Sequence, residues 1–260
     1  MRQGGILSPF LFKFYINSII NNISSLEEGC NIGISKINIL AYADDIALVA
    51  NTKEHMNLIY DRLKSQLEGL GLQINKSKTK CLLFGLSNVG NIPKTLVLAG
   101  DEIEVVSTYK YLGHYIEGTL NDDKDMEHKL MKFYGSTNSI LRNFKYVDVN
   151  TLLFLFTSYC KPMYGLTLWN NKSSFNRCNF KTLNIAFNNT LKRIIGVPKY
   201  TSNHITADIA GHLLLGNQIA LLQSGFYYRL LNSKSLLIRY NLPFLKFWKD
   251  DLNFLTRIYE

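Results

Sequence analysis

The hydrophobic pattern of the first 120 residues predicts helices mixed with strands. Large apolar residues recur at helical spacing over 10–23, directly behind Ser8-Pro9. Serine is favoured at a helix N-cap and proline in the first turn, so we expect a helix to about Ser24 with Ser8 as its cap. A second helix is expected over 52–70, between a capping Asn51 or Thr52 and a glycine-rich end.

Short apolar runs predict the strands. Ile37–Tyr42 and Ile46–Ala50 enclose Ala43-Asp44-Asp45, which indicates a β-hairpin with two carboxylates at its turn. The same criteria predict a strand over 81–84 and a second hairpin formed by 96–98 and 103–106.

The pattern changes near residue 120. Residues 121–125 are polar, and the periodicity after them is helical, which predicts helices at about 126–144, 149–169, 177–195 and 207–231. A mixed segment followed by a helical one defines the fold class as α+β. We divide the chain into 1–120, 121–215 and 216–260.

Charge is concentrated in the helical part. The 260 residues carry 29 basic and 20 acidic side chains, a net charge of +9. Between 129 and 207 there are eleven basic residues and one acidic residue, a balance of +10, whereas the rest holds 18 and 19. Such a segment is either a solvated basic face or a surface for nucleic acid or anionic lipid.

The cysteine spacing, the N-terminus and the length of the apolar runs bear on where the protein is located in the cell. The four cysteines are scattered, with no C-x-x-C spacing and no zinc pattern, which is typical of buried thiols in an intracellular protein. The N-terminus lacks a signal-peptide pattern, and no apolar run reaches about 18 residues. We therefore expect a nuclear or cytoplasmic protein that does not insert into a membrane.

Asp44 and Asp45 are the strongest chemical candidates. Adjacent carboxylates in an apolar hairpin raise each other's pKa and resist burial, and a divalent cation between them offsets both costs. An ordinary aspartate turn is the alternative, because aspartate favours turns. At average residue frequencies, Tyr-x-Asp-Asp arises by chance in roughly one chain of this length in fifty.

The order of motifs around this turn resembles the reverse transcriptases of non-LTR retrotransposons, of the long interspersed element type. The motifs, in order, are Arg2-Gln3-Gly4-Gly5-Ile6-Leu7-Ser8-Pro9, Ala41-Tyr42-Ala43-Asp44-Asp45, the segment 71–80 and Tyr109-Lys110-Tyr111-Leu112-Gly113. The segments 162–169 and 191–198 are similar to the region that follows in those elements. The resemblance covers about residues 1–215.

The resemblance implies a fold and a reaction. Residues 1–120 would be part of the palm of a right-hand polymerase, 121–215 a basic helical thumb and 216–260 a helical tail. The implied activity is RNA-directed DNA synthesis by two-metal nucleotidyl transfer, with two Mg²⁺ ions as cofactors. The implied partners are an RNA template, a DNA primer and a deoxynucleoside triphosphate, with no membrane; the oligomeric state is not implied.

The resemblance also implies a role for particular residues. Asp44 would bind metal, with Asp45 supporting it. Residues expected near the template, primer end or nucleotide are Gln3, Gly4, Tyr42, Ala43 and Lys78. A primer-gripping turn is expected at Tyr111, Leu112 and Gly113. Cations expected on the nucleic-acid backbone are Lys129, Lys132, Arg142, Lys145, Lys192 and Arg193. The alternatives without a functional role are that Lys78 is a solvent-exposed loop lysine and that Tyr111 and Leu112 are core residues.

One part of the family pattern is missing. Such polymerases hold their metals with a third aspartate upstream of the Arg2-Gln3-Gly4 motif, but only Met1 precedes it and no acidic residue occurs before Glu27. We therefore expect a C-terminal fragment of an RNA-directed DNA polymerase that is inactive alone. The alternatives are a non-catalytic nucleic-acid-binding remnant and a non-functional pseudogene product.

Overall fold

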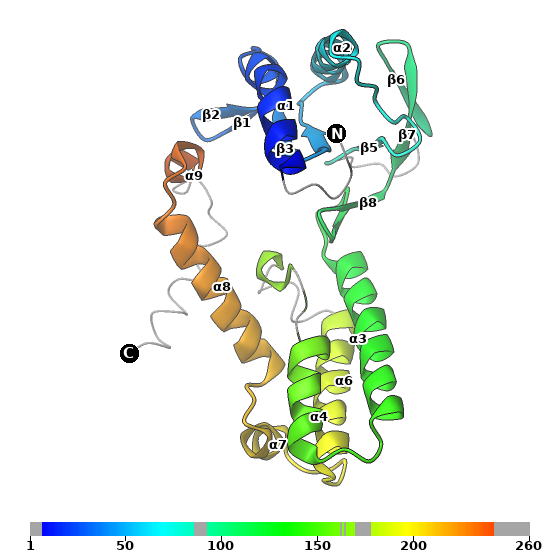
Figure 1. Cartoon of the computed structure of the whole chain (residues 1–260), viewed down its shortest axis with the longest axis vertical. Coiled ribbons are helices and arrows are strands. Elements are labelled where there is room, and N and C mark those ends of the chain that lie inside the picture. The colour runs from blue at the N-terminus through cyan, green and yellow to red at the C-terminus, as the bar shows by residue number, and fades with distance from the viewer. Residues whose placement is uncertain (1–6, 86–92, 162, 164, 170–177, 242–260) are drawn as a thin grey trace. The chain divides into compact units, whose positions relative to one another are not determined.

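The computed structural model describes residues 7–85, 93–161, 163, 165–169 and 178–241 (Figure 1). Contacts divide the chain into two compact units. Unit one comprises the described residues of 1–83, 87–106 and 234–244, and unit two those of 84–86, 107–233 and 245–260. Both contain helices and strands, so the α+β prediction is confirmed at that level.

Unit one consists of helices and short sheets. Its helices are α1 (Ser8–Ser24), α2 (Lys53–Gly69) and α9 (Leu236–Asn241), and its strands are β1 (Cys30–Ile32), β2 (Ser35–Ile37), β3 (Ile39–Tyr42), β4 (Asp45–Leu48), β5 (Lys80–Leu82), β6 (Thr95–Leu98) and β7 (Asp101–Val106). β1 pairs with β2 and β3 with β4, both antiparallel. A third sheet has the order β5-β7-β6, in which β5 runs parallel to β7 and β6 antiparallel.

The core of unit one lies between α1, α2 and the β3–β4 hairpin. Apolar residues three or four positions apart bury one face of each helix, which is the expected pattern for packed amphipathic helices. The buried residues of this core are Ile16, Ile19, Ile23, Ile39, Ile59, Leu63 and Leu67. Thr52 caps α2 by accepting a hydrogen bond from the His55 N–H, as the sequence predicts for one of two candidate caps.

Unit two begins with a hairpin and continues as helices. The hairpin is formed by β8 (Thr108–Tyr111) and β9 (His114–Glu117). The helices are α3 (Asp123–Asn143), α4 (Val149–Leu155), the π-helical turn η2 (Phe156–Cys160), the 3₁₀ turn η3 (Leu166–Leu168), α6 (Cys178–Ile195), α7 (Asn203–Ala210) and α8 (Leu215–Leu231). α3, α4 and α6 run side by side (Figure 1).

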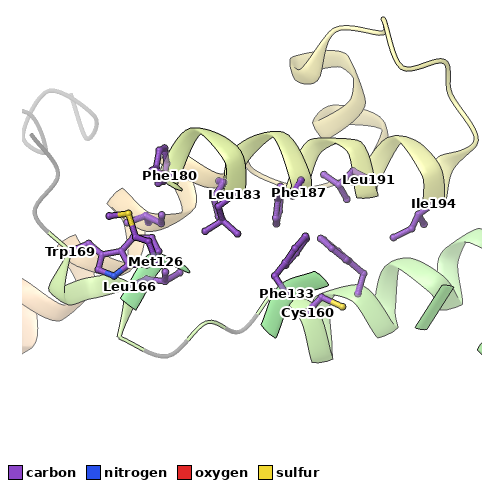
Figure 2. Close-up of a cluster of buried hydrophobic side chains, with 14 of the residues drawn as sticks. Met126, Phe133, Cys160, Leu166, Trp169, Phe180, Leu183, Phe187, Leu191 and Ile194 are labelled. Atoms are coloured by element: carbon purple, nitrogen blue, oxygen red, sulfur yellow. The ribbon is translucent and has the colours of Figure 1, made fainter. Parts of the chain in front are cut away.

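The core of unit two is built around aromatic rings. Phe133 of α3 and Phe187 of α6 are directed toward each other, as Figure 2 shows, with ring centroids 6.2 Å apart. Phe156 of η2 packs against both, at 6.1 and 5.3 Å. All three are 1% exposed or less, so these rings hold the three segments together.

Several predicted boundaries are wrong, and backbone geometry explains two of them. The single helix expected over 149–169 ends as η2 at Cys160, and Gly165 has φ +82°, which no α-helix contains. The helix expected over 207–231 is interrupted at Gly211, which has φ +63° and ends α7. α1 begins at Ser8 itself, so its cap position is Leu7. The β1–β2 hairpin falls in a segment without a strand pattern.

The interruption at Gly211 divides what would be one long apolar helix into two shorter ones. α7 and α8 meet at 61°. Among the described residues, no single helix is long and apolar enough to cross a membrane, and this bent pair reaches the necessary length and composition only when its two helices are taken together.

Candidate functional site

The two adjacent aspartates lie at the end of the β3–β4 hairpin. Tyr42 pairs with Asp45, which leaves Ala43 and Asp44 as a two-residue turn. Ala43 has φ +54°, a left-handed value at the first turn residue only, which is the pattern of a type II′ turn. Asp44 and Asp45 are both exposed, and Tyr42 is 67% exposed. The turn therefore presents two carboxylates and a phenol to solvent.

The base of this hairpin is anchored in the core. Ile39 is 8% exposed and packs in the α1–α2 cluster. The neighbouring Asn38 side chain is buried and donates to the carbonyls of Ile23, at 2.7 Å, and Glu28, at 3.2 Å. Because breaking the hydrogen bonds of a buried amide costs free energy, these contacts anchor the base of the carboxylate turn.

The donor chemistry of the turn fits a magnesium ion in part. Carboxylate oxygens are the ligands that Mg²⁺ prefers, and Mg²⁺ is commonly held by one or two carboxylates together with waters and phosphates. Within the described ranges, no group of three or more histidine, cysteine, aspartate or glutamate side chains is placed to hold a metal. The turn thus supplies at most two carboxylates to such a site.

The other residues predicted to lie near the substrates are distributed over both units. Gln3 and Gly4 lie outside the described residues. Lys78 is exposed in unit one, on a turn where its backbone N–H donates to the Asn75 carbonyl at 3.1 Å.

The expected primer-gripping residues form the tight turn of the β8–β9 hairpin. Tyr111 pairs with His114, so Leu112 and Gly113 are the turn residues, with φ values of +46° and +82°. Positive φ at both positions is the pattern of a type I′ turn, which suits the twist of a hairpin. Leu112 and Gly113 are exposed, and Tyr111 is partly buried.

The six cations expected on a nucleic-acid backbone fall into two groups. Four of them are exposed, and we call them the unit-two cations: Lys132, Arg142, Lys145 and Arg193. The ammonium groups of Lys129 and Lys192 are buried instead. Lys129 is paired with Asp125, and Lys192 donates to the Lys199 carbonyl at 2.9 Å. These two therefore point into the protein.

A buried polar network around Asp125 joins three segments of unit two, and the sequence reasoning missed it. Asp125 is 0% exposed. Its carboxylate accepts from Lys129 Nζ, from Trp169 Nε1 at 2.7 Å and from the Tyr115 N–H at 3.1 Å. His114 Nδ1 lies 3.1 Å from Asp125 Oδ2, within ion-pair distance but without the alignment of a hydrogen bond.

Electrostatics keeps the Asp125 carboxylate ionised. Burial alone would raise its pKa, but the neighbouring polar groups of His114, Lys129 and Trp169 outweigh burial and lower the pKa to about 2. Burial lowers the pKa of Lys129, which Asp125 partly restores. One signal was available: Lys129 recurs at helical spacing with Met126 and Phe133, which places it on the apolar face of α3.

A second missed network lies in unit one. Asp101, 5% exposed, forms ion pairs with Lys64 at 2.9 Å and Lys76 at 2.5 Å and accepts a hydrogen bond from Tyr60 at 3.1 Å. Lys76 first, then Lys64 and Tyr60, hold the pKa of Asp101 at about 2. Burial together with this carboxylate raises the pKa of Tyr60 to about 12. The network ties α2 to the β6–β7 turn.

Comparison with known protein families finds a match for the part of the chain that contains this turn. Residues 1–116, which contain both the carboxylate turn and the β8–β9 turn, match the family described as reverse transcriptase (RNA-dependent DNA polymerase). This region is therefore homologous to reverse transcriptase domains.

The individual relatives that the chain resembles are polyproteins of retrotransposable elements. The chain is similar to the Pol polyprotein of the type-2 element R2DM of Drosophila melanogaster, 31% identical over 33% of this chain and 8% of the relative. It is 28% identical to the type-1 element R2 polyprotein of Popillia japonica, over 44% and 17%. It is 25% identical to the type-1 element R1 polyprotein of Nasonia vitripennis, over 54% and 42%.

These matches confirm the resemblance to reverse transcriptases of non-LTR retrotransposons. The chain spans less than half the length of each of these three relatives.

Proposed function

We propose that this chain carries the metal-binding turn and the primer-holding region of an RNA-directed DNA polymerase of the non-LTR retrotransposon type. The observation that carries the proposal is the exposed Asp44–Asp45 pair on a hairpin turn with an anchored base. Homology of residues 1–116 to reverse transcriptases supports it. The substrates would be an RNA template, a DNA primer and a deoxynucleoside triphosphate.

The chemistry assigned to the turn is nucleotidyl transfer. The primer 3′-oxygen forms a bond to the α-phosphorus, and the bond to pyrophosphate breaks. Asp44 would hold the metal, Asp45 would support it, and exposed Tyr42 and Ala43 would lie beside the primer end. Two Mg²⁺ ions, when bound, supply the charge that favours the primer alkoxide and offsets the negative charge of the leaving pyrophosphate.

In this proposal the chain by itself extends primers weakly or not at all. Octahedral Mg²⁺ is poorly held by one or two exposed carboxylates, and the described residues bring no third metal-binding side chain to the turn. We expect near-background primer extension with Mg²⁺ or Mn²⁺. If the chain extends primers robustly and Asp44→Asn abolishes that extension, the prediction of weak activity is refuted. The same result would support the role of the turn in catalysis.

Metal binding tests the turn without requiring turnover. Mn²⁺ is paramagnetic, and its binding to the whole chain can be followed by electron paramagnetic resonance. We expect Asp44→Asn to weaken Mn²⁺ binding at least tenfold, whereas Asp208→Asn, a matched exposed aspartate of α7, leaves it unchanged. Equal Mn²⁺ binding by both variants and the parent chain would refute the assignment.

A second function, sequence-independent nucleic-acid binding, is favoured by the four unit-two cations. If all four contact phosphates, the affinity for a primer–template duplex should fall about 100-fold between 50 and 200 mM salt. Arg193→Gln should lower the slope of log affinity against log salt by about 1, and Lys13→Gln, an exposed lysine of α1, should not. A flat salt response would exclude this function.

A further inference from the structure

Unit two contains a cavity of about 260 Å³ beside the β8–β9 turn. It lies between the hairpin, α3 and η2, and its lining is unusually rich in basic side chains. The polar lining residues are Lys110, His128, Lys129, Lys132, Ser136 and Tyr159. Within the described part of the chain, no carboxylate lines it.

The positive charge of this cavity is only partly neutralised. The Lys129 ammonium is paired with buried Asp125 and is therefore committed to the protein. Lys110 and Lys132 form no ion pair with any carboxylate of the described residues. Like charges held around one small cavity repel each other, and an anion placed among them removes that repulsion.

Neighbouring rings hold these groups in place. The ammonium of Lys110 lies 5.8 Å from the centroid of the Tyr115 ring, and this ring packs on His128 with centroids 4.8 Å apart. Lys110 and His128 of α3 therefore both lie against the ring of Tyr115. Tyr159 is 69% exposed on the π-helical turn, a type of distortion that is frequent at functional sites.

Size and donor geometry favour a small oxyanion. The cavity volume of 260 Å³ is below the range of about 300–1,000 Å³ for drug-sized ligands and accommodates a phosphate together with ordered water. The donors come from three segments: Lys110 from β8, His128 and Lys132 from α3, and the Tyr159 hydroxyl from η2. Donors supplied by three different segments suit the tetrahedral oxygens of a phosphate better than a planar carboxylate, which favours two parallel donors.

We propose that this cavity is a phosphate-binding site, in which Lys110 and Lys132 bind the phosphate oxygens and His128 and Tyr159 contribute further contacts. The phosphate group belongs either to free inorganic phosphate or to a nucleic-acid strand. The site stands independently of the carboxylate turn, because none of its residues is near Asp44 in sequence or lies in unit one. Failure of the Asp44 experiments would leave it intact.

Titration with inorganic phosphate tests the site directly. Calorimetry on the whole chain, at ionic strength held constant with chloride, should show saturable binding that Lys110→Gln or Lys132→Gln weakens at least tenfold. Lys181→Gln, an exposed lysine of α6 outside the cavity, should bind phosphate as the parent chain does, and Lys132→Arg should retain binding. Circular dichroism confirms that each variant is folded.

Phosphate binding that is absent in the parent chain, or equal in all the glutamine variants, would overturn the proposal. A second arm uses a primer–template duplex to identify the source of the phosphate. If inorganic phosphate competes with the duplex and Lys110→Gln weakens duplex binding tenfold, the occupant is a strand phosphate. If phosphate binds but duplex affinity is unchanged in Lys110→Gln, the occupant is free phosphate.

Discussion

Replacing Asp125 by asparagine should destabilise unit two strongly. The change keeps the size of the side chain but removes the charge that Lys129 faces, and the Lys129 side chain is only 6% exposed. Removing one partner of a buried ion pair typically costs about 3–5 kcal/mol, because the other charge stays buried without compensation.

The ionisation of Asp125 and of Lys129 gives two free energies that bear on this cost. The pKa of Asp125 is lowered from 3.8 to about 2, and this shift corresponds to about 2 kcal/mol of stability from the carboxylate. In the variant, Lys129 can escape its penalty by losing its proton. From an ordinary pKa of 10.5 this costs about 5 kcal/mol at pH 7 and about 2 kcal/mol at pH 9.

The destabilisation of Asp125→Asn should therefore shrink as pH rises from 7 to 9. In the variant, folded molecules lose the Lys129 proton more readily than unfolded ones, so the unfolded state binds up to one more proton over this range and folding stability rises with pH. In the parent chain the effect is at the acid end: the contribution of Asp125 is fully present above pH 4 and is lost as pH falls toward 2.

Urea denaturation measures this effect. The two tryptophans are Trp169 and Trp248, so in a Trp248→Phe background the fluorescence reports on Trp169 of unit two. Asp208→Asn should change the free energy of unfolding by less than about 0.5 kcal/mol. Adding Lys129→Met to Asp125→Asn should recover part of the loss. A cost below about 1 kcal/mol that is the same at pH 7 and pH 9 would refute the reasoning.

Three further predictions concern other parts of the chain. Ala43→Gly should raise the free energy of unfolding of unit one by up to about 1 kcal/mol in thermal denaturation, because glycine adopts positive φ without strain; a loss of stability would contradict the turn geometry. Cys178 is exposed and Cys160 is 3% exposed, so a thiol reagent should label the first at once and the second only after unfolding, as peptide mass spectrometry can measure. Asp101→Asn should weaken the acid dependence of unit-one stability between pH 4 and pH 2, followed by circular dichroism, since the lowered pKa of Asp101 makes its contribution disappear in that range; an unchanged acid transition would count against the network.

Local patterns predicted much of unit one. The pair Ser8-Pro9 and the spacing of the following isoleucines placed a helix that the structure ends at the predicted Ser24. A short apolar run, or a polar residue before a periodic one, is a local signal, and local backbone preference decides such elements. The same local signals failed over 149–169, where Gly165 has a left-handed backbone and lies so close to His114, a residue far away in sequence, that a Cβ there would come within 3.0 Å of His114 Nδ1.

By itself, the sequence determined the resemblance to reverse transcriptases, the order of the motifs and the two adjacent carboxylates, because these depend only on residue type and spacing. The tertiary structure decided which charges are available. Eleven basic residues between 129 and 207 looked alike as a count, yet the fold turns Lys129 toward Asp125 and Lys192 toward a backbone carbonyl. Both partners are near in sequence, but the packing that buries the Lys129–Asp125 pair comes from distant segments, because Trp169 and Tyr115 of the β8–β9 hairpin donate hydrogen bonds to Asp125.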